Sequence, residues 1–201
     1  MLVNGIDTTQ LAASEQLLRT APGPVGLAVR VRGRWQDAYS TQVETDEMVV
    51  GGEVVPRGHT VHVDLPVLLG GRDRGPAPGE LLLAALSTCV AQGIVEQAAA
   101  DGITVRRVEV AAEGELDLRG AAGFDGIPAG LTGVRLRFAV DADADAGQLD
   151  DLLAGAVRTS PVADSLTAGV ALDARVARVH PFATAQGTGH PQTDHDVQQR
   201  E

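Results

Sequence analysis

The stretch Pro78-Gly79-Glu80-Leu81-Leu82-Leu83-Ala84-Ala85-Leu86-Ser87-Thr88-Cys89-Val90 carries the single cysteine of the 201-residue chain. A proline at its start and a long apolar run predict a helix over 79–100, ended by Asp101-Gly102. The first three turns are apolar nearly all round, which predicts that this helix is buried at the centre of the fold. A cysteine in such a helix is by default an inert packing residue, and it becomes a nucleophile only where its surroundings favour the thiolate.

The rest of the chain predicts strands and helices in separate blocks. A short helix over 7–19, with Asp7 or a threonine as its N-cap, precedes a meander of four strands. The meander strands are expected at 25–32, 38–44, 49–55 and 59–64, with turns at Gly33-Arg34 and Gly51-Gly52. After the central helix come strands at 105–116 and 133–140, a helix at 146–159, a restart at Ser160-Pro161 and a strand at 170–179. Segregated strands and helices of this kind indicate an α+β fold.

We expect three regions along the chain. Residues 1–22 form an N-terminal helical arm, residues 23–182 one folded domain, and residues 183–201 a disordered C-terminal tail. The tail is assigned because its sequence is polar and poor in hydrophobic residues, so it lacks the apolar surface that folding needs.

Composition excludes several classes of function. The net charge is −11, and aromatic residues make up only 2% of the chain, which disfavours binding to nucleic acid. The chain has no lysine, so a lysine Schiff base is excluded. One cysteine excludes an intramolecular disulfide. The N-terminus lacks a secretory signal pattern and no run of about 18 apolar residues occurs, so we expect a cytoplasmic protein that does not enter a membrane.

The glycine-rich loop, the helix that follows it and a downstream Pro-Val carry a family resemblance. Gly70-Gly71, Gly75-Pro76 and the stretch 78–89 resemble the OsmC/Ohr superfamily of osmotically inducible and organic-hydroperoxide-resistance proteins. Ser160-Pro161-Val162 falls where that superfamily usually has Cys-Pro-Val. The resemblance covers roughly residues 25–180, including the order of the elements.

The resemblance implies an intertwined homodimer of curved antiparallel sheets with two central helices in each chain. Enzymes of this superfamily reduce organic hydroperoxides with a peroxidatic cysteine in the first central helix, which becomes a sulfenic acid. A second cysteine on the other central helix closes a disulfide, and an external thiol reduces it. An arginine from the meander and a glutamate after the helix-leading proline keep the thiolate reactive.

The catalytic residues carry over unevenly to this chain. Cys89 matches the peroxidatic position, whereas Ser160 stands at the resolving position and cannot form a disulfide. Gly79 occupies the place of the glutamate, and Glu80 is the next residue. Glu80 precedes Cys89 by nine helical positions and so points about 180° away from it. For the arginine we nominate Arg34, in the expected turn after the first strand.

These residues lead to a main hypothesis and two alternatives. The main one is reduction of organic hydroperoxides through Cys89 alone, with an external thiol as reductant and no cofactor. An apolar interface pocket lined by Leu82, Leu86 and residues of the second helix, Ser160 included, would bind a small apolar substrate. The first alternative is a non-catalytic dimer that binds an apolar small molecule in that pocket. The second is a different thiol-dependent transformation.

Other patterns are interpreted as structural. Ser160 is expected to cap a helix before Pro161 rather than to act as a nucleophile. The loop 69–75 is expected to shape the mouth of a pocket over Cys89, where Arg72 and Arg74 could contact an anion. Asp141, Asp143 and Asp145 lack the spacing of a calcium loop and suit the N-terminus of a helix. We predict no metal site.

Overall fold

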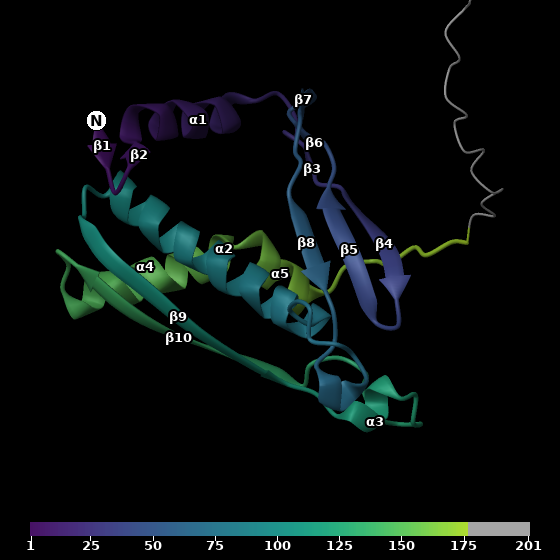
Figure 1. Ribbon diagram of the computed structural model, residues 1–201. Coiled ribbons are helices and arrows are strands. Elements are labelled where there is room, and N and C mark those ends of the chain that lie inside the picture. The colour runs from purple at the N-terminus through teal and green to yellow at the C-terminus, as the bar shows by residue number, and fades with distance from the viewer. Residues whose placement is uncertain (177–201) are drawn as a thin grey trace, which may run out of the picture. The chain divides into compact units, whose positions relative to one another are not determined.

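The computed structural model describes residues 1–176 (Figure 1). The N-terminal elements are β1 (Leu2–Val3), β2 (Ile6–Asp7) and α1 (Thr8–Thr20). The next strands are β3 (Leu27–Ala28), β4 (Val31–Asp37), β5 (Ser40–Thr45), β6 (Met48–Val50), β7 (Glu53–Val55) and β8 (Thr60–Val63). A short 3₁₀ turn (Val67–Leu69) precedes α2 (Pro78–Ala100), β9 (Val105–Glu115), α3 (Leu118–Ala121), β10 (Gly133–Ala142), α4 (Ala146–Thr159) and α5 (Pro161–Ala168). All strand pairs are antiparallel, which agrees with the expected α+β class.

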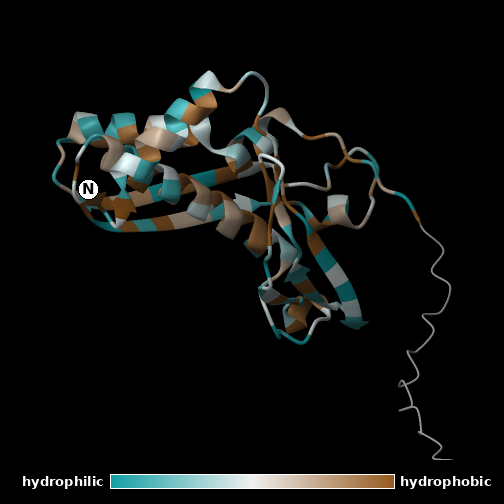
Figure 2. Cartoon of the chain, turned by 90° about the horizontal axis from the view of Figure 1, so that it is seen from above, coloured by the Kyte–Doolittle hydropathy of each residue, from teal (hydrophilic) through white to brown (hydrophobic). Residues whose placement is uncertain are grey.

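The core lies where α2 and α4 run along the long β9–β10 hairpin (Figure 1). The hairpin pairs Gly133 with Glu115 at one end and Ala142 with Val105 at the other. Hydrophobic and hydrophilic residues alternate along its strands (Figure 2), so one face packs on the helices and the other does not. The buried core residues are Leu86, Val90, Ile94, Ala98, Leu152 and Ala156.

Small residues bring α2 and α4 into close contact. A Cβ added at Gly93 would lie 3.1 Å from the Cβ of Ala156, and one added at Gly155 would lie 2.2 Å from Oε1 of Gln97. The two helices run antiparallel across this contact. Because Gly93 is one turn after Cys89 and Ala156 is one turn before Ser160, the same contact brings Cys89 and Ser160 together.

The antiparallel meander is present, but the four predicted strands are wrong: it consists of three long strands, each interrupted once, and the predicted strand at 49–55 contains the β6–β7 turn. The pairs are β3 with β6, β6 with β7, β4 with β5, and β5 with β8. The interruptions fall side by side, because Asp46 N donates to Arg30 O at 2.9 Å and Thr45 N donates to His59 O at 2.8 Å. Ion pairs of Arg30 with Glu47 and of Arg32 with Asp46 also lie at this line.

One of the two turns predicted in the meander is correct and the other is wrong. Gly51-Gly52 forms the β6–β7 turn, where Val50 pairs with Glu53. Gly33 and Arg34 lie inside β4, opposite Val43 and Gln42. The β4–β5 turn instead falls at Ala38-Tyr39, and Ala38 has a φ of 44°. An alanine in the left-handed region is uncommon, so sequence chemistry alone favoured the glycine.

The N-terminal arm begins as the sequence predicts. The carboxylate of Asp7 accepts hydrogen bonds from Thr9 N and Gln10 N and so caps α1. The β1–β2 turn is fixed by Asn4, whose side chain donates to Ile103 O at 3.0 Å and accepts from Val105 N at 2.8 Å. The arm is therefore attached to the segment between α2 and β9, although no residue of α1 is buried.

The strand predicted over 170–179 is not formed in its described part. Residues 170–176 carry no helix or strand, and their large apolar side chains, Val170, Leu172 and Val176, are exposed. A strand forms only where a neighbouring edge supplies hydrogen bonds, and no described strand of this chain does so here. Residues 177–201, which include the predicted tail, lie outside the described residues. Residues 1–169 form a compact unit that ends before this segment.

Helix α2 meets the length and composition of a membrane-spanning segment, and among residues 1–176 it is the one helix that does. The core helix of a water-soluble protein meets the same test. One face of α2 is covered by α4 and β9, with Val90 and Ile94 almost fully buried.

Candidate functional site

Cys89 meets Ser160 at the place where α2 approaches the junction of α4 and α5. The hydroxyl of Ser160 donates a hydrogen bond to Sγ of Cys89 at 3.1 Å. The same hydroxyl accepts from Ala163 N at 3.1 Å, so Ser160 is the N-cap of α5 as predicted. Ser160 is buried, with 3% of its surface exposed, and Cys89 is partly buried. The cap holds the hydroxyl oxygen in place and directs its proton to the sulfur.

This arrangement places a hydrogen-bond donor and the N-terminus of a helix at the sulfur of Cys89. A sulfur that accepts a hydrogen bond gains more from it when it is negatively charged. The N-terminus of α5 also lies beside the sulfur and carries the partial positive charge of the helix. The sequence placed Ser160 in a capping role, and the structure adds the contact with Cys89, which no local pattern shows.

A groove of about 560 Å³ opens beside the sulfur of Cys89. Its volume lies within the range of small-molecule sites. Residues of α1 form one side, residues of α2 the other, and the α4–α5 junction closes the end at Cys89. The lining residues are Leu11, Ser14, Glu15, Leu18, Cys89, Gln92, Gly93, Glu96, Gln97, Ala100, Ala156, Thr159, Ser160 and Pro161.

The two leucines predicted to bind substrate do not line this groove. Leu86 is buried in the core between α2 and α4, with 5% of its surface exposed. Leu82 is on α2 and is 38% exposed. The helix is therefore not buried all round in the single chain: one apolar face is core, and Leu82 belongs to a face that this chain leaves open.

Glu80 performs a structural task at the start of α2. Its carboxylate accepts a hydrogen bond from Ala77 N at 2.7 Å and so caps the helix. Its side chain is exposed and does not line the groove at Cys89.

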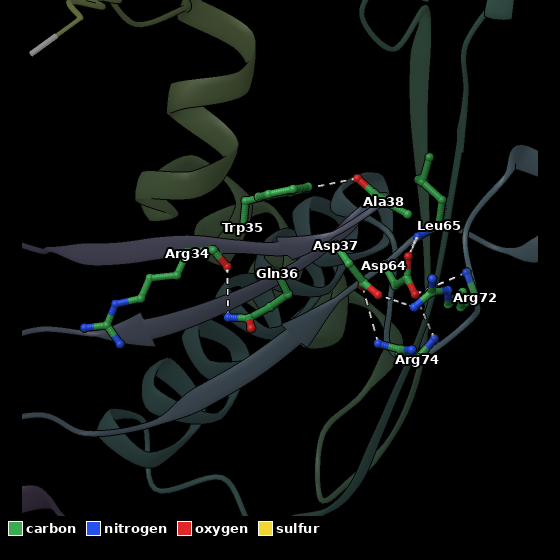
Figure 3. Close-up of polar contacts among 9 residues, drawn as sticks. All are labelled: Arg34, Trp35, Gln36, Asp37, Ala38, Asp64, Leu65, Arg72 and Arg74. Carbon is green, nitrogen blue, oxygen red and sulfur yellow. Dashed lines mark hydrogen bonds and ion pairs between the residues drawn. The ribbon is translucent and has the colours of Figure 1, made fainter. Parts of the chain in front are cut away.

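Arg34, the nominated activating arginine, is an exposed residue within β4. Its guanidinium pairs with the carboxylate of Glu44 at 3.5 Å. Figure 3 shows its side chain extended away from the cluster formed by Asp37, Arg72 and Arg74. Arg34 is not among the groove-lining residues of this chain.

The glycine-rich loop encloses a buried carboxylate rather than the cysteine. The side chain of Asp64, 1% exposed, accepts from the backbone N–H groups of Leu65, Arg72 and Arg74 at 2.8, 3.2 and 3.4 Å (Figure 3). Burial alone would raise the pKa of Asp64, but these donors outweigh it and hold the pKa below its ordinary value. The loop passes so close to the preceding strand that a Cβ at Gly75 would lie 2.1 Å from His62 O.

The two loop arginines are also engaged within the chain. Arg72 and Arg74 both pair with the carboxylate of Asp37. The expectation that this loop forms the mouth of a pocket over Cys89 is therefore wrong for the single chain, because none of its residues lines the groove.

Of the three aspartates around the end of β10, Asp145 acts at a helix start as expected, whereas Asp141 and Asp143 form ion pairs that were not predicted. Asp145 caps α4 by accepting from Gln148 N at 2.9 Å. Asp141 and Asp143 both pair with Arg106, which lowers the pKa of Asp141 and raises that of Arg106. Within residues 1–176 no three His, Cys, Asp or Glu side chains are grouped so that they could hold a metal ion.

The groove residues of α1 and of the second half of α2 were not predicted from the sequence. The signal for them is the spacing Leu11, Ser14, Leu18 on α1 and Cys89, Glu96 on α2, which places each set on one face of its helix. That spacing shows which residues share a face. It does not show that the two faces oppose each other, which depends on the attachment of Asn4 to Ile103 and Val105.

Solved structures with the same fold include three bacterial proteins. The chain is 15% identical to an OsmC-like protein from Mycoplasma pneumoniae, with a TM-score of 0.55 over 71% of this chain and 89% of that one. It is 18% identical to an OsmC-like protein of unknown function from Vibrio cholerae, with a TM-score of 0.55 over 69% and 92% of the two chains. For an osmotic stress induced and detoxification response protein from Psychrobacter arcticus the values are 17%, 0.51, 67% and 85%.

Identities this low establish a shared fold and nothing more specific. Among curated protein sequences, none matches the chain. The family model described as OsmC-like protein matches residues 70–175, more than half of the 201 residues. This match spans the glycine-rich loop, the helix of Cys89, the β9–β10 hairpin and the Ser160 cap. The chain therefore belongs to the OsmC-like protein family.

Proposed function

We propose that the protein reduces organic hydroperoxides through Cys89 as its one redox-active residue. The observation that supports this most directly is the 3.1 Å hydrogen bond from the Ser160 hydroxyl to the Cys89 sulfur, beside an open groove. An inert packing cysteine would need neither a buried donor on its sulfur nor access to solvent.

The reaction balances with one cysteine and an external thiol. The Cys89 thiolate attacks the terminal peroxide oxygen, so an S–O bond forms and the O–O bond breaks. The leaving alkoxide takes a proton and departs as the alcohol, and Cys89 becomes a sulfenic acid. A first thiol molecule then forms a mixed disulfide and releases water. A second thiol molecule displaces Cys89 and leaves as the oxidised disulfide.

Ser160 has two tasks in this scheme. Its hydroxyl stabilises the attacking thiolate, and afterwards it can donate to the sulfenate oxygen or sulfur. Because a serine cannot form a disulfide, the sulfenic acid stays available to the external thiol. Ser160 thus serves as a positioning donor where the two-cysteine enzymes of the superfamily have their resolving cysteine.

We further propose that the protein acts as a homodimer in the cytoplasm, where thiol reductants are available. The two three-stranded sheets formed by strands β3 to β8 supply only Val63 to the buried hydrophobic residues among residues 1–176, and they leave many apolar side chains exposed. Those exposed on the sheets include Leu27, Val31, Trp35, Val54 and Val61. A sheet normally buries one face, and a second copy of the chain would cover these.

Four of the residues assigned to the site remain predictions: Arg34, Glu80, Leu82 and Leu86. In the single chain Arg34 pairs with Glu44 and Glu80 caps α2, so a catalytic role would require the second subunit to bring either group to a sulfur. Leu82, on the open face of α2, is the better placed of the two leucines for an interface pocket. Arg34→Gln and Leu82→Ser, each assayed for turnover of hydroperoxide, test these assignments.

The test of the proposed function is turnover of cumene hydroperoxide with dithiothreitol, together with mass spectrometry of Cys89. We expect addition of one oxygen to Cys89 and loss of turnover in Cys89→Ser. Ser160→Ala should slow the reaction with peroxide about tenfold, because a hydrogen bond to a charged group contributes about 1.5 kcal/mol.

A matched control separates chemistry from helix stability. Asp145→Ala removes the cap of α4, as Ser160→Ala removes the cap of α5, and each cap contributes about 1 kcal/mol. Asp145→Ala should leave peroxide turnover unchanged. Full turnover in Cys89→Ser, or no oxidation of Cys89 at all, would exclude the peroxidase and leave the non-catalytic binding of an apolar molecule as the alternative.

A further inference from the structure

The groove is bounded by one stripe of residues on each of two facing helices. On α1 the stripe is Leu11, Ser14, Glu15 and Leu18, at the spacing of successive helical turns. On α2 it runs from Cys89 through Gly93 and Glu96 to Ala100. Ser14 of α1 and Glu96 of α2 line both this groove and another beside it, so each helix contributes a polar side chain there.

The charged side chains that line this groove are carboxylates. Its ionisable lining residues are Glu15, Glu96 and Cys89, and neither an arginine nor a histidine is among the described residues that line it. Glu15 pairs with Arg19, one turn further along the same face of α1, which offsets its charge. Glu96 forms no ion pair with any described residue, so its charge is not offset within the part of the chain that the structure describes.

Glu96 lies on the same face of α2 as the cysteine. The two residues are seven positions apart, which is about two turns and about 10 Å along the helix axis. A second groove of about 320 Å³ shares Leu11, Ser14 and Glu96 with the first and is also lined by Ile6 and Asp7. The carboxylate of Asp7 lies 3.5 Å from the N-terminal ammonium of Met1, which offsets its charge, so Glu96 is the carboxylate of these two grooves that pairs with no described cation.

We propose that the groove between α1 and α2 selects the substrate by charge: it admits neutral or cationic hydroperoxides with an apolar body and rejects those that carry a carboxylate. The apolar body would lie against Leu11, Leu18 and Pro161, which line the groove together with Ala100. This inference names the substrate class of the site and therefore rests on the proposed function.

The size of the effect follows from the spacing of the charges. A carboxylate on a substrate about 8 Å from Glu96, in a half-open groove of intermediate dielectric, is disfavoured about fivefold at low salt, which corresponds to about 1 kcal/mol. Added salt should weaken the discrimination, because the Debye length falls to about 3 Å at 1 M ionic strength.

The first experiment measures charge selection at Cys89 without requiring turnover. Two methanethiosulfonate reagents of similar size, one bearing a sulfonate and one a trimethylammonium group, are reacted with the protein and with a free thiol. Relative to the free thiol, Cys89 should react at least fivefold more slowly with the anionic reagent than with the cationic one. Glu96→Gln should reduce this ratio about fivefold, and 1 M salt should reduce it in the unaltered protein.

Glu53→Gln is the matched control, because it removes the same charge from an exposed residue of β7 that does not line the groove. It should leave the ratio unchanged. Equal relative rates for both reagents, or the same change in both variants, would overturn the charge selection. Failure of both reagents to modify Cys89 would also overturn it, because the groove would then not lead to the sulfur.

The second experiment uses two peroxides that differ only in charge, cumene hydroperoxide and its ring-carboxylated derivative. We expect kcat/KM for the carboxylate to be at least fivefold lower and to recover in Glu96→Gln, with cumene hydroperoxide unaffected. Equal turnover of both peroxides would refute the selection while the peroxidase function stands. Absence of turnover together with charge-selective labelling would refute the peroxidase function while the selection stands.

Discussion

Replacing Ser160 with cysteine tests the contact on which the site is built. Oγ of Ser160 lies 3.1 Å from Sγ of Cys89, whereas two sulfur atoms in a disulfide are about 2.0 Å apart. The side chains must approach by about 1 Å, which the longer C–S bond of the new residue partly supplies. We expect Ser160→Cys to form a disulfide with Cys89 when one equivalent of hydroperoxide is added.

The stability of the oxidised variant can be worked from the chain separation. The two residues are 71 positions apart, so the chain-entropy relation gives about 4 kcal/mol of stabilisation for a loop of this length. Loss of the serine cap of α5 costs about 1 kcal/mol in both redox states. The oxidised variant should therefore be about 3 kcal/mol more stable than the unaltered protein, and the reduced variant about 1 kcal/mol less stable.

The assay counts free thiols and measures the melting temperature with and without reductant. Thiols should fall from two to zero per chain on oxidation, and the melting temperature should rise by about 10 °C, since 1 kcal/mol corresponds to about 2–4 °C in a chain of this size. Thr159→Cys is the control, because Oγ1 of Thr159 faces Gln97, two turns along α2 from Cys89. Two free thiols after oxidation of Ser160→Cys would refute the helix contact.

Three further perturbations address the loop, its buried carboxylate and the N-terminal arm. Gly75→Ala should destabilise the protein by about 1–3 kcal/mol, because the new Cβ meets His62 O. Gly79→Ala, with open space around the new Cβ, should stabilise the protein by up to about 1 kcal/mol. Equal melting temperatures of the two variants would contradict the close approach of the loop to His62. The pKa of Asp64 is lowered in the folded state, so its stabilising contribution is present above about pH 4 and is lost as pH falls through the folded pKa. Asp64→Asn should therefore lower the melting temperature at pH 7 and make it depend less on pH in acid. An unchanged dependence on pH in acid would argue against the role of this carboxylate. Asn4→Gly should free the arm, because both hydrogen bonds of the Asn4 side chain are lost, and should speed both proteolysis within residues 5–22 and labelling of Cys89. Asn4→Ala should in addition introduce about 1 kcal/mol of strain, because Asn4 has a φ of 53°. Equal proteolysis rates in both variants and the unaltered protein would show that the arm is held elsewhere.

Local signals in the sequence predicted the elements that carry the site. The proline and apolar run predicted a helix at 79–100, and α2 spans Pro78–Ala100. Ser160 and Pro161 predicted a helix restart, and Asp7 a helix start, because a cap is a property of a few adjacent residues. The stretch 78–89 also identified Cys89 as the candidate redox-active residue.

The features that the sequence did not predict all depend on distant contacts. Arg34 was assigned to a turn because glycine precedes it, yet strand register overrides that preference and places it opposite Gln42. The strand at 170–176 has a suitable alternation but no edge to pair with in the described chain. The groove needs α1 beside α2, and nothing within α1 reports where that helix will lie.

The attachment of Asn4 also sets an order of events during synthesis. Its two hydrogen bonds join the fourth residue to Ile103 and Val105, about a hundred residues later. At a translation rate of about 5–20 residues per second, the arm waits about 5–20 s for its partner to be made. Through that interval Leu17 and Leu18, exposed even in the folded chain, have nothing to pack against. The arm that encloses the groove is thus made well before the segment to which it docks.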